Sequence, residues 1–134
     1  MDKPKVVRVS DVMKNQLHRV DGIDTVQSAL GKIVSDQTHA LIVNKRDDDD
    51  EYGIVLLADI AKKVIAKNRS PERVNIYEIM SKPVVSVRGD MDIRYCARLF
   101  NSFGLNVAPV EDEHGELMGT VSYNDIVLNG LVAS

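Results

Sequence analysis

Residues 119–126 read Gly-Thr-Val-Ser-Tyr-Asn-Asp-Ile, and residues 53–60 read Gly-Ile-Val-Leu-Leu-Ala-Asp-Ile. Both stretches begin with glycine, place valine two residues later and end in Asp-Ile. The correspondence extends outward at a constant offset, with one residue lost just before the glycine, through the pairs Met13 and Met80, Gly22 and Gly89, and Val43 and Val110. A register of this length indicates an internal repeat, and the repeat decides the architecture.

Each repeat is predicted to contain a short helical turn, a strand, a helix, two further strands and a final helix. After Asp24 and after Asp92, apolar residues recur at the spacing of an amphipathic helix, and each aspartate is predicted to cap its helix. The paired strands are predicted at residues 40–44 and 52–56, and again at 107–111 and 117–122. The expected fold class is therefore α/β, with two β-α-β-β-α repeats.

The chain divides into two repeats and a linker. Residues 1–66 form the first repeat with an N-terminal lead-in, residues 67–75 a polar linker, and residues 76–134 the second repeat. A unit of about 60 residues buries little surface by itself. The two repeats are therefore expected to pack together around a pseudo-two-fold axis.

Composition excludes several classes of function. The chain has 134 residues, a net charge of −3 and no tryptophan, which argues against a nucleic-acid-binding surface. It has no apolar run long enough to span a membrane and no apolar export leader. The single cysteine, Cys96, cannot form an intrachain disulfide and is expected to be a buried small apolar residue. These features predict a cytoplasmic protein.

The repeat pattern resembles the CBS domain family, and two such repeats in tandem resemble a Bateman module. The residues that carry the resemblance most specifically are 119–126 and 106–110, with looser counterparts at 53–60 and 39–43. The resemblance implies a regulatory module that binds AMP, ADP, ATP or S-adenosylmethionine between its repeats. It also implies a homodimer.

A ribose-binding pair is predicted at the end of the second repeat. Ser122 lies three residues before Asp125, at the junction of a strand and a helix. A carboxylate there can accept hydrogen bonds from both ribose hydroxyls, and the serine hydroxyl can add another contact. The first repeat keeps Asp59 but has Leu56 in place of the hydroxyl, so the cleft of Asp125 is favoured. In both repeats the aspartate has an alternative role, favouring the helix dipole.

Further contacts are implied by the family resemblance. For the cleft of Asp125, Leu17 and His18 would contact the adenine. For the cleft of Asp59, Val84 and Val85 would do so. His39 and Asn106 would contact phosphate. A histidine at position 39 would bind phosphate more strongly at lower pH, when it is protonated. The alternative for both histidines is an ordinary position on the solvated surface.

No metal site is predicted. The acidic run at residues 47–51 lacks the spacing of an EF-hand and is interpreted as a solvated hairpin loop. His114 stands alone among flexible carboxylates. Motifs for phosphate-binding loops, dinucleotide folds and hydrolases are absent from the sequence, so the chain is not expected to be an enzyme.

Three hypotheses for the function remain. The leading one is a non-catalytic module that binds an adenosine-containing ligand, requires no cofactor and passes its state to an effector protein that the sequence does not identify. The alternative is a structural pair that dimerises or acts as a scaffold with empty clefts. An enzyme or metalloprotein ranks last.

Overall fold

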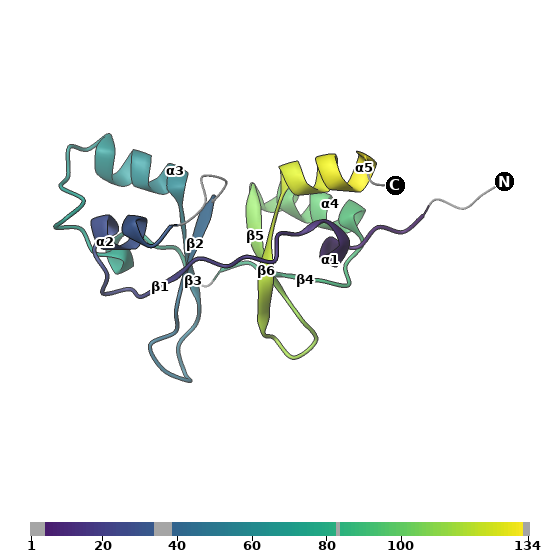
Figure 1. Cartoon of the computed structure of the whole chain (residues 1–134), viewed down its shortest axis with the longest axis horizontal. Helices are drawn as coiled ribbons and strands as arrows, with labels where there is room; N and C mark the ends of the chain where they lie inside the picture. The colour runs from purple at the N-terminus through teal and green to yellow at the C-terminus, as the bar shows by residue number, and fades with distance from the viewer. Residues whose placement is uncertain (1–4, 34–38, 83, 133–134) are drawn as a thin grey trace. The chain divides into compact units, whose positions relative to one another are not determined.

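The computed structural model describes residues 5–33, 39–82 and 84–132. It divides into two compact units (Figure 1). One, here the central unit, is His18–Val84; the other, here the C-terminal unit, combines Met1–Leu17 with Val85–Ser134. The N-terminal lead-in therefore belongs to the unit that contains the second repeat, and residues 67–84 belong to the unit that contains the first.

The central unit is built on a three-stranded sheet. Its strands are β1 (Arg19–Val20), β2 (Ala40–Val43) and β3 (Gly53–Leu56), in the order β1-β2-β3. β1 runs parallel to β2, and β2 is antiparallel to β3, with Ala40 opposite Leu56 and Val43 opposite Gly53. β2 and β3 lie within the predicted ranges 40–44 and 52–56.

The C-terminal unit repeats this topology. Its sheet consists of β4 (Val87–Arg88), β5 (Val107–Glu111) and β6 (Leu117–Ser122), in the order β4-β5-β6. β4 is parallel to β5, and β5 is antiparallel to β6, with Val110 opposite Gly119. The predicted α/β class with two β-α-β-β-α repeats is confirmed.

The helices follow the repeat as well. The central unit contains α2 (Val26–Gly31), α3 (Leu57–Ile60), the π-helical η1 (Ala61–Ile65) and the 3₁₀ turn η2 (Ile76–Glu78). The C-terminal unit contains α1 (Val9–Val12), α4 (Ile93–Phe103), the π-helical η3 (Asp125–Asn129) and α5 (Gly130–Val132). None of the described helices is long and apolar enough to cross a membrane.

One of the two predicted helix caps is wrong. Asp92 caps α4 as expected, accepting from the Arg94 N–H at 2.9 Å, and its hydrogen bonds with Arg94 lower the pKa of Asp92 to about 2. At α2 the cap is Thr25, whose hydroxyl accepts from the Ser28 N–H. Asp24 instead accepts from the Asp21 N–H, because it closes the preceding turn.

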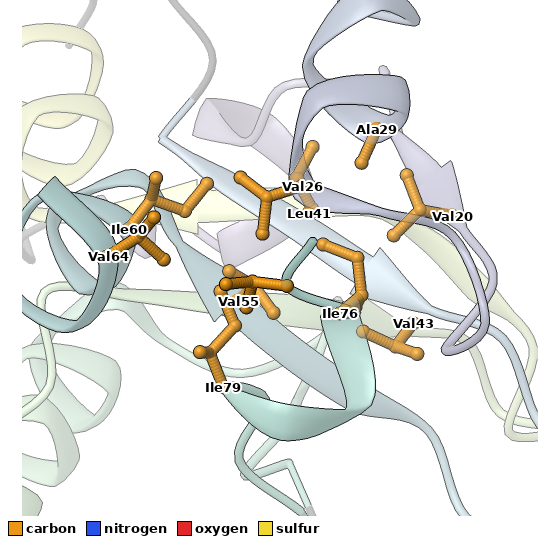
Figure 2. Packing of buried hydrophobic residues seen from close by; sticks show 11 residues of the cluster. Val20, Val26, Ala29, Leu41, Val43, Val55, Ile60, Val64, Ile76 and Ile79 are labelled. Carbon is orange, nitrogen blue, oxygen red and sulfur yellow. The ribbon is translucent and has the colours of Figure 1, made fainter. Parts of the chain in front are cut away.

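Each unit has its own hydrophobic core. Figure 2 shows that of the central unit, where Leu41 and Val55 of the sheet meet Val64 of η1. Ile76 and Ile79, from the lead-in of the second repeat, are buried in the same cluster. The C-terminal core is built in the matching way, from the lead-in residues Val9 and Val12 together with Val87, Ile93, Cys96, Phe100, Ala108, Val110, Val121 and Ile126.

The lead-in of each repeat pairs with the last strand of the other repeat, close to the glycine that begins each quoted stretch. Lys14 pairs with Thr120 on β6 through two backbone hydrogen bonds, Lys14 N–H to Thr120 O at 2.9 Å and Thr120 N–H to Lys14 O at 3.0 Å. A Cβ atom on Gly119 would overlap the Lys14 carbonyl oxygen. In the central unit Ser81 pairs with Ile54 in the same way, but a Cβ atom on Gly53 would lie 3.1 Å from the Met80 Sδ atom and 3.4 Å from the Ser81 carbonyl oxygen. The crossing therefore requires glycine at position 119, whereas position 53 is only tightly packed.

Candidate functional site

Ser122 and Asp125 form a reciprocal pair where β6 passes into the following helix. The Asp125 Oδ2 atom accepts from the Ser122 N–H at 2.9 Å and from the Ser122 hydroxyl at 3.0 Å. The Asp125 N–H in turn donates to the Ser122 hydroxyl oxygen at 3.2 Å. Both residues are buried, with 7% and 5% of their surface exposed. The pair satisfies two helix-terminal N–H groups, so Oδ2 already has a structural role.

The second carboxylate oxygen of Asp125 faces a cation from the lead-in. Lys14 Nζ lies 3.4 Å from Oδ1, and 39% of the lysine side chain is exposed. Sequence reasoning missed Lys14, because its counterpart in the other repeat is Ser81 and the repeat gives no signal for a lysine there. The arrangement is a buried carboxylate with one oxygen held by the helix start and the other beside an ammonium group.

Asp59 occupies the matching place in the central unit. Its Oδ2 accepts from the Leu56 N–H at 3.2 Å, as Asp125 accepts from Ser122. Leu56 has no hydroxyl to donate, and Asp59 is only half-buried. The departure noted in the sequence is thus visible as a carboxylate with fewer partners.

His39 and Asn106 lie beside these two helix starts. The His39 carbonyl accepts from the Leu57 N–H at 3.0 Å, and the Asn106 carbonyl accepts from the Tyr123 N–H at 3.2 Å. Both side chains are exposed. In the central unit His39 is therefore close to Leu57, the residue after Leu56. In the C-terminal unit Asn106 is close to Tyr123, the residue after Ser122.

The residues predicted to contact adenine are those at which the chain passes from one unit to the other. Leu17 ends the lead-in of the C-terminal unit, and His18 begins the central unit. The other junction falls between Val84 and Val85. Leu17, His18 and Val84 are half-buried, Val85 is exposed, and the His18 carbonyl accepts from the Ile42 N–H at 2.8 Å. Their contact with adenine stays a prediction.

The acidic run at residues 47–51 is predicted to be a solvated loop, but Asp50 within it is nearly buried and forms ion pairs. Asp50 has 8% of its side chain exposed and receives Lys82 Nζ at 2.6 Å, the Arg46 N–H at 2.9 Å and Arg46 Nε at 3.2 Å. The hydrogen bond from Lys82 is the main cause that lowers the pKa of Asp50. Asp47, Asp48 and Asp49 are exposed. In the described parts of the chain, His, Cys, Asp and Glu form no group of three that could hold a metal ion.

Cys96 is fully buried on α4, as predicted from the apolar stripe of that helix. Burial raises the pKa of its thiol to about 11. The thiolate is therefore scarce at neutral pH, and Cys96 lacks the properties of a nucleophile.

A family model described as the CBS domain matches residues 9–66 and again residues 76–130. The two matches follow the repeats, while the compact units exchange their lead-ins. An uncharacterised protein of Methanopyrus kandleri is 33% identical over 87 residues, which are 65% of this chain and 43% of that protein. A homoserine O-acetyltransferase of Methanosalsum zhilinae is 30% identical over 122 residues, 90% of this chain and 23% of that protein. The chain thus spans less than half the length of these curated relatives.

Solved structures share the fold over nearly the whole chain. A hexameric CBS-CP12 protein from bloom-forming cyanobacteria has a TM-score of 0.85 and 35% identity, over 92% of this chain and 68% of that one. The cytosolic domain of the Mg²⁺ channel MgtE, in complex with ATP, has a TM-score of 0.62 and 27% identity, over 87% and 46%. The CBS domain pair of protein MJ0100, in complex with 5′-methylthioadenosine and S-adenosylmethionine, has a TM-score of 0.78 at 21% identity, over 97% and 100%.

Proposed function

Because the chain belongs to the CBS domain family and carries two CBS domains in tandem, we propose that it is a regulatory module that binds an adenosine-containing ligand at Asp125. The observation that carries the proposal is the buried pair of Ser122 and Asp125. A ligand whose adenosine part is held there would bias the module between states by its differential affinity for them. An effector protein would read that state.

The geometry of Asp125 supports a ribose contact through one defined atom. Oδ2 is committed to the N–H and hydroxyl of Ser122, which fixes the carboxylate in one orientation. We propose Oδ1 as the acceptor for a ribose hydroxyl, which would approach it beside the partly exposed Lys14 ammonium, 3.4 Å from Oδ1. A charged acceptor makes a stronger hydrogen bond to a hydroxyl than a neutral one does.

The ligand class rests on what related modules bind. The MgtE cytosolic domain was solved with ATP, and the MJ0100 pair with 5′-methylthioadenosine and S-adenosylmethionine. All three contain adenosine, so the ribose and the adenine are the common elements to be recognised. We propose that Leu17 and His18 contact the adenine at Asp125, and that Val84 and Val85 do so at Asp59. Asn106 and His39 are the corresponding candidates for phosphate.

Asp59 is proposed as the weaker of the two sites. It keeps the carboxylate and its hydrogen bond from the Leu56 N–H. The hydroxyl that orients Asp125 is absent, so the carboxylate of Asp59 is less fixed before a ligand arrives. Less preorganisation lowers affinity, because the ligand must then order the group it binds.

A homodimer is part of the same proposal. Phe103 on α4 and Leu128 on η3 expose 64% and 60% of their surface, and Val127 beside Leu128 exposes half. Exposed apolar side chains such as these favour association with a second copy. These residues also support the alternative function, a scaffold that dimerises without ligand, for which the missing hydroxyl at Leu56 is the second argument.

We propose that the module itself is not catalytic and that it works in the cytoplasm. The inert thiol of Cys96 supports both points, since it is no nucleophile and has no partner for an intrachain disulfide. The acetyltransferase activity of the Methanosalsum relative belongs to a protein of which this chain covers 23%.

The test is calorimetric titration of the full chain with AMP, ADP, ATP and S-adenosylmethionine, supported by thermal shift. Asp125→Asn keeps an oxygen for the Ser122 N–H but removes the charged acceptor, so we expect binding to weaken about 10-fold or more. Asp59→Asn is the matched control at the sister position and is expected to have the smaller effect. Circular dichroism establishes that both variants are folded.

The outcomes separate the two functions. A ligand that binds the parent chain and is weakened by Asp125→Asn supports the sensor. Equal affinity of the parent and Asp125→Asn would place the ligand elsewhere and overturn the site. No binding of any of the four, with a dimer that Leu128→Asp dissociates in sedimentation, would favour the scaffold.

A further inference from the structure

The central unit contains a cavity of about 660 Å³ away from Asp59. It lies where β1 and β2 end, lined by Gly22, Val43 and the lead-in residues Tyr77 and Met80. Val43 pairs with Gly53 at this end of the sheet, whereas Ala40 pairs with Leu56 at the end that carries Asp59. In Figure 1 the β2–β3 hairpin extends from this end, away from α3. The cavity is thus separate from the proposed ribose site of the same unit.

Three cations border this cavity: Lys45, Arg46 and Lys82. Asp50 binds Lys82 through Oδ1 and Arg46 through Oδ2, so one carboxylate holds two of the three in place. Arg46 nevertheless has 80% of its side chain exposed, and the ion pair engages only its Nε atom. The other acid at the wall, Asp21, accepts from the Asn44 amide at 3.0 Å. Cationic groups therefore outnumber carboxylates, and the guanidinium of Arg46 keeps a face toward solvent.

In the matching corner of the C-terminal unit, the three acids Asp90, Asp112 and Glu113 outnumber the two cations Arg8 and Arg88. This corner contains a cavity of about 230 Å³ beside Gly89, the counterpart of Gly22. Asp112 and Glu113 stand there at the positions that Lys45 and Arg46 hold in the central unit. The fold alone therefore does not require an excess of cations at this corner. The replacement of Lys45 and Arg46 by acids in the other unit points to a property specific to the central unit.

We propose that the cavity of the central unit binds a small organic anion with an apolar or aromatic body and one phosphate or carboxylate group. Its volume lies within the roughly 300–1,000 Å³ of small-molecule sites. Val43, Tyr77 and Met80 would contact the body of the ligand. Arg46 and Lys45 would receive the oxyanion, for which a guanidinium is well suited. The site is independent of Asp125 and of the adenosine ligand proposed above.

The experiment follows amide resonances of the ¹⁵N-labelled full chain during titration with phenyl phosphate, benzoate and benzyl alcohol. The two anions share a ring with the neutral alcohol, so the alcohol isolates the contribution of charge. We expect saturable shifts at Gly22, Asn44 and Tyr77 with an anion at concentrations up to about 10 mM, and none with the alcohol. The tighter anion identifies the phosphate or the carboxylate as the preferred group.

Variants locate the site. Arg46→Met keeps the stem of the side chain and removes its charge, and we expect about 10-fold weaker binding of the anion. Lys62→Met removes one exposed charge from η1 of the same unit and serves as the control, with affinity unchanged. Asp125→Asn also leaves the affinity unchanged, so the failure of the adenosine site and the failure of this one are told apart.

Three results would overturn the proposal. They are the absence of saturable shifts with either anion, equal loss of affinity in Arg46→Met and Lys62→Met, and shifts as large at Gly89 and Asp112 as at Gly22. The last would show an unspecific effect of the anion at both corners.

Discussion

Lys14 and Asp125 form an ion pair of 3.4 Å that joins the N-terminal lead-in to the helix following β6. The lysine also pairs with Thr120 through its backbone, so one residue fixes both the strand crossing and the candidate site. The proposed ligand site of the C-terminal unit is therefore built from residues at the two ends of the sequence.

Replacing Lys14 by methionine is expected to destabilise the C-terminal unit by about 1 kcal/mol, because the buried Asp125 carboxylate loses a cationic partner. The lysine is 39% exposed, and solvent screening keeps the loss this small. Urea unfolding followed by circular dichroism measures the change. Lys62→Met, at an exposed position of η1, controls for removal of a charge. An equal effect of the two substitutions would contradict a structural role for the pair.

Substitution of glycine by alanine is expected to have opposite effects at two positions. At Gly119 the added methyl group would overlap the Lys14 carbonyl, so the lead-in must shift and about 2 kcal/mol of stability is lost. At Gly31, in α2, nothing lies within 4 Å of the new atom, and alanine is expected to stabilise the helix by up to about 1 kcal/mol. Thermal unfolding of the two variants measures both changes. Similar stability of Gly119→Ala and the parent would mean that the lead-in does not cross the sheet as described.

The repeat predicted the strands within a residue or so because buried strands and tight crossings leave strong local patterns. Val55 lies between the partly exposed Ile54 and Leu56, and Gly53 and Gly119 lie where a lead-in passes. The same reasoning did not find Lys14. Its contact with Asp125 depends on which unit receives the lead-in, and that choice is made by tertiary packing of Val9 and Val12.

Two interactions of charged side chains could not be predicted from the local sequence. Asp24 and Thr25 are both good capping residues, and the sequence does not show that the preceding turn takes the aspartate. In the acidic run, five residues of similar character differ because only Asp50 meets Lys82. The partner of Asp50 lies in the lead-in of the other repeat, beyond the reach of any pattern within the loop.

The thiol of Cys96 is expected to resist alkylation in the native state. Burial raises its pKa to about 11, so the thiolate is scarce at about pH 8, where an exposed cysteine reacts readily. Reaction with iodoacetamide is expected to be about 100-fold slower than in denaturant. Mass spectrometry of samples quenched over time measures both rates. Native alkylation as fast as that of the denatured chain would show that α4 opens readily.

Because of the ion pairs of Asp50, the stability of the folded protein is expected to fall at low pH. Hydrogen bonds from Lys82 and Arg46 lower the pKa of Asp50 in the folded state, and the unfolded chain keeps the ordinary value of about 4. The stabilisation is therefore complete above about pH 4 and is lost as pH falls through the lower, folded value. Asp50→Asn should thus reduce the melting temperature at about pH 7, and its difference from the parent should shrink towards about pH 3.

Asp48→Asn is the matched control, because Asp48 lies in the same acidic run but is exposed. Relief of repulsion between neighbouring carboxylates should leave this variant as stable as the parent or slightly more so. Lys82→Met should reproduce much of the effect of Asp50→Asn, and the double variant should cost less than the two single changes together, because the same contact is removed in each. Strict additivity, or a difference from the parent that does not change with pH, would mean that the loop and the lead-in are held by other contacts.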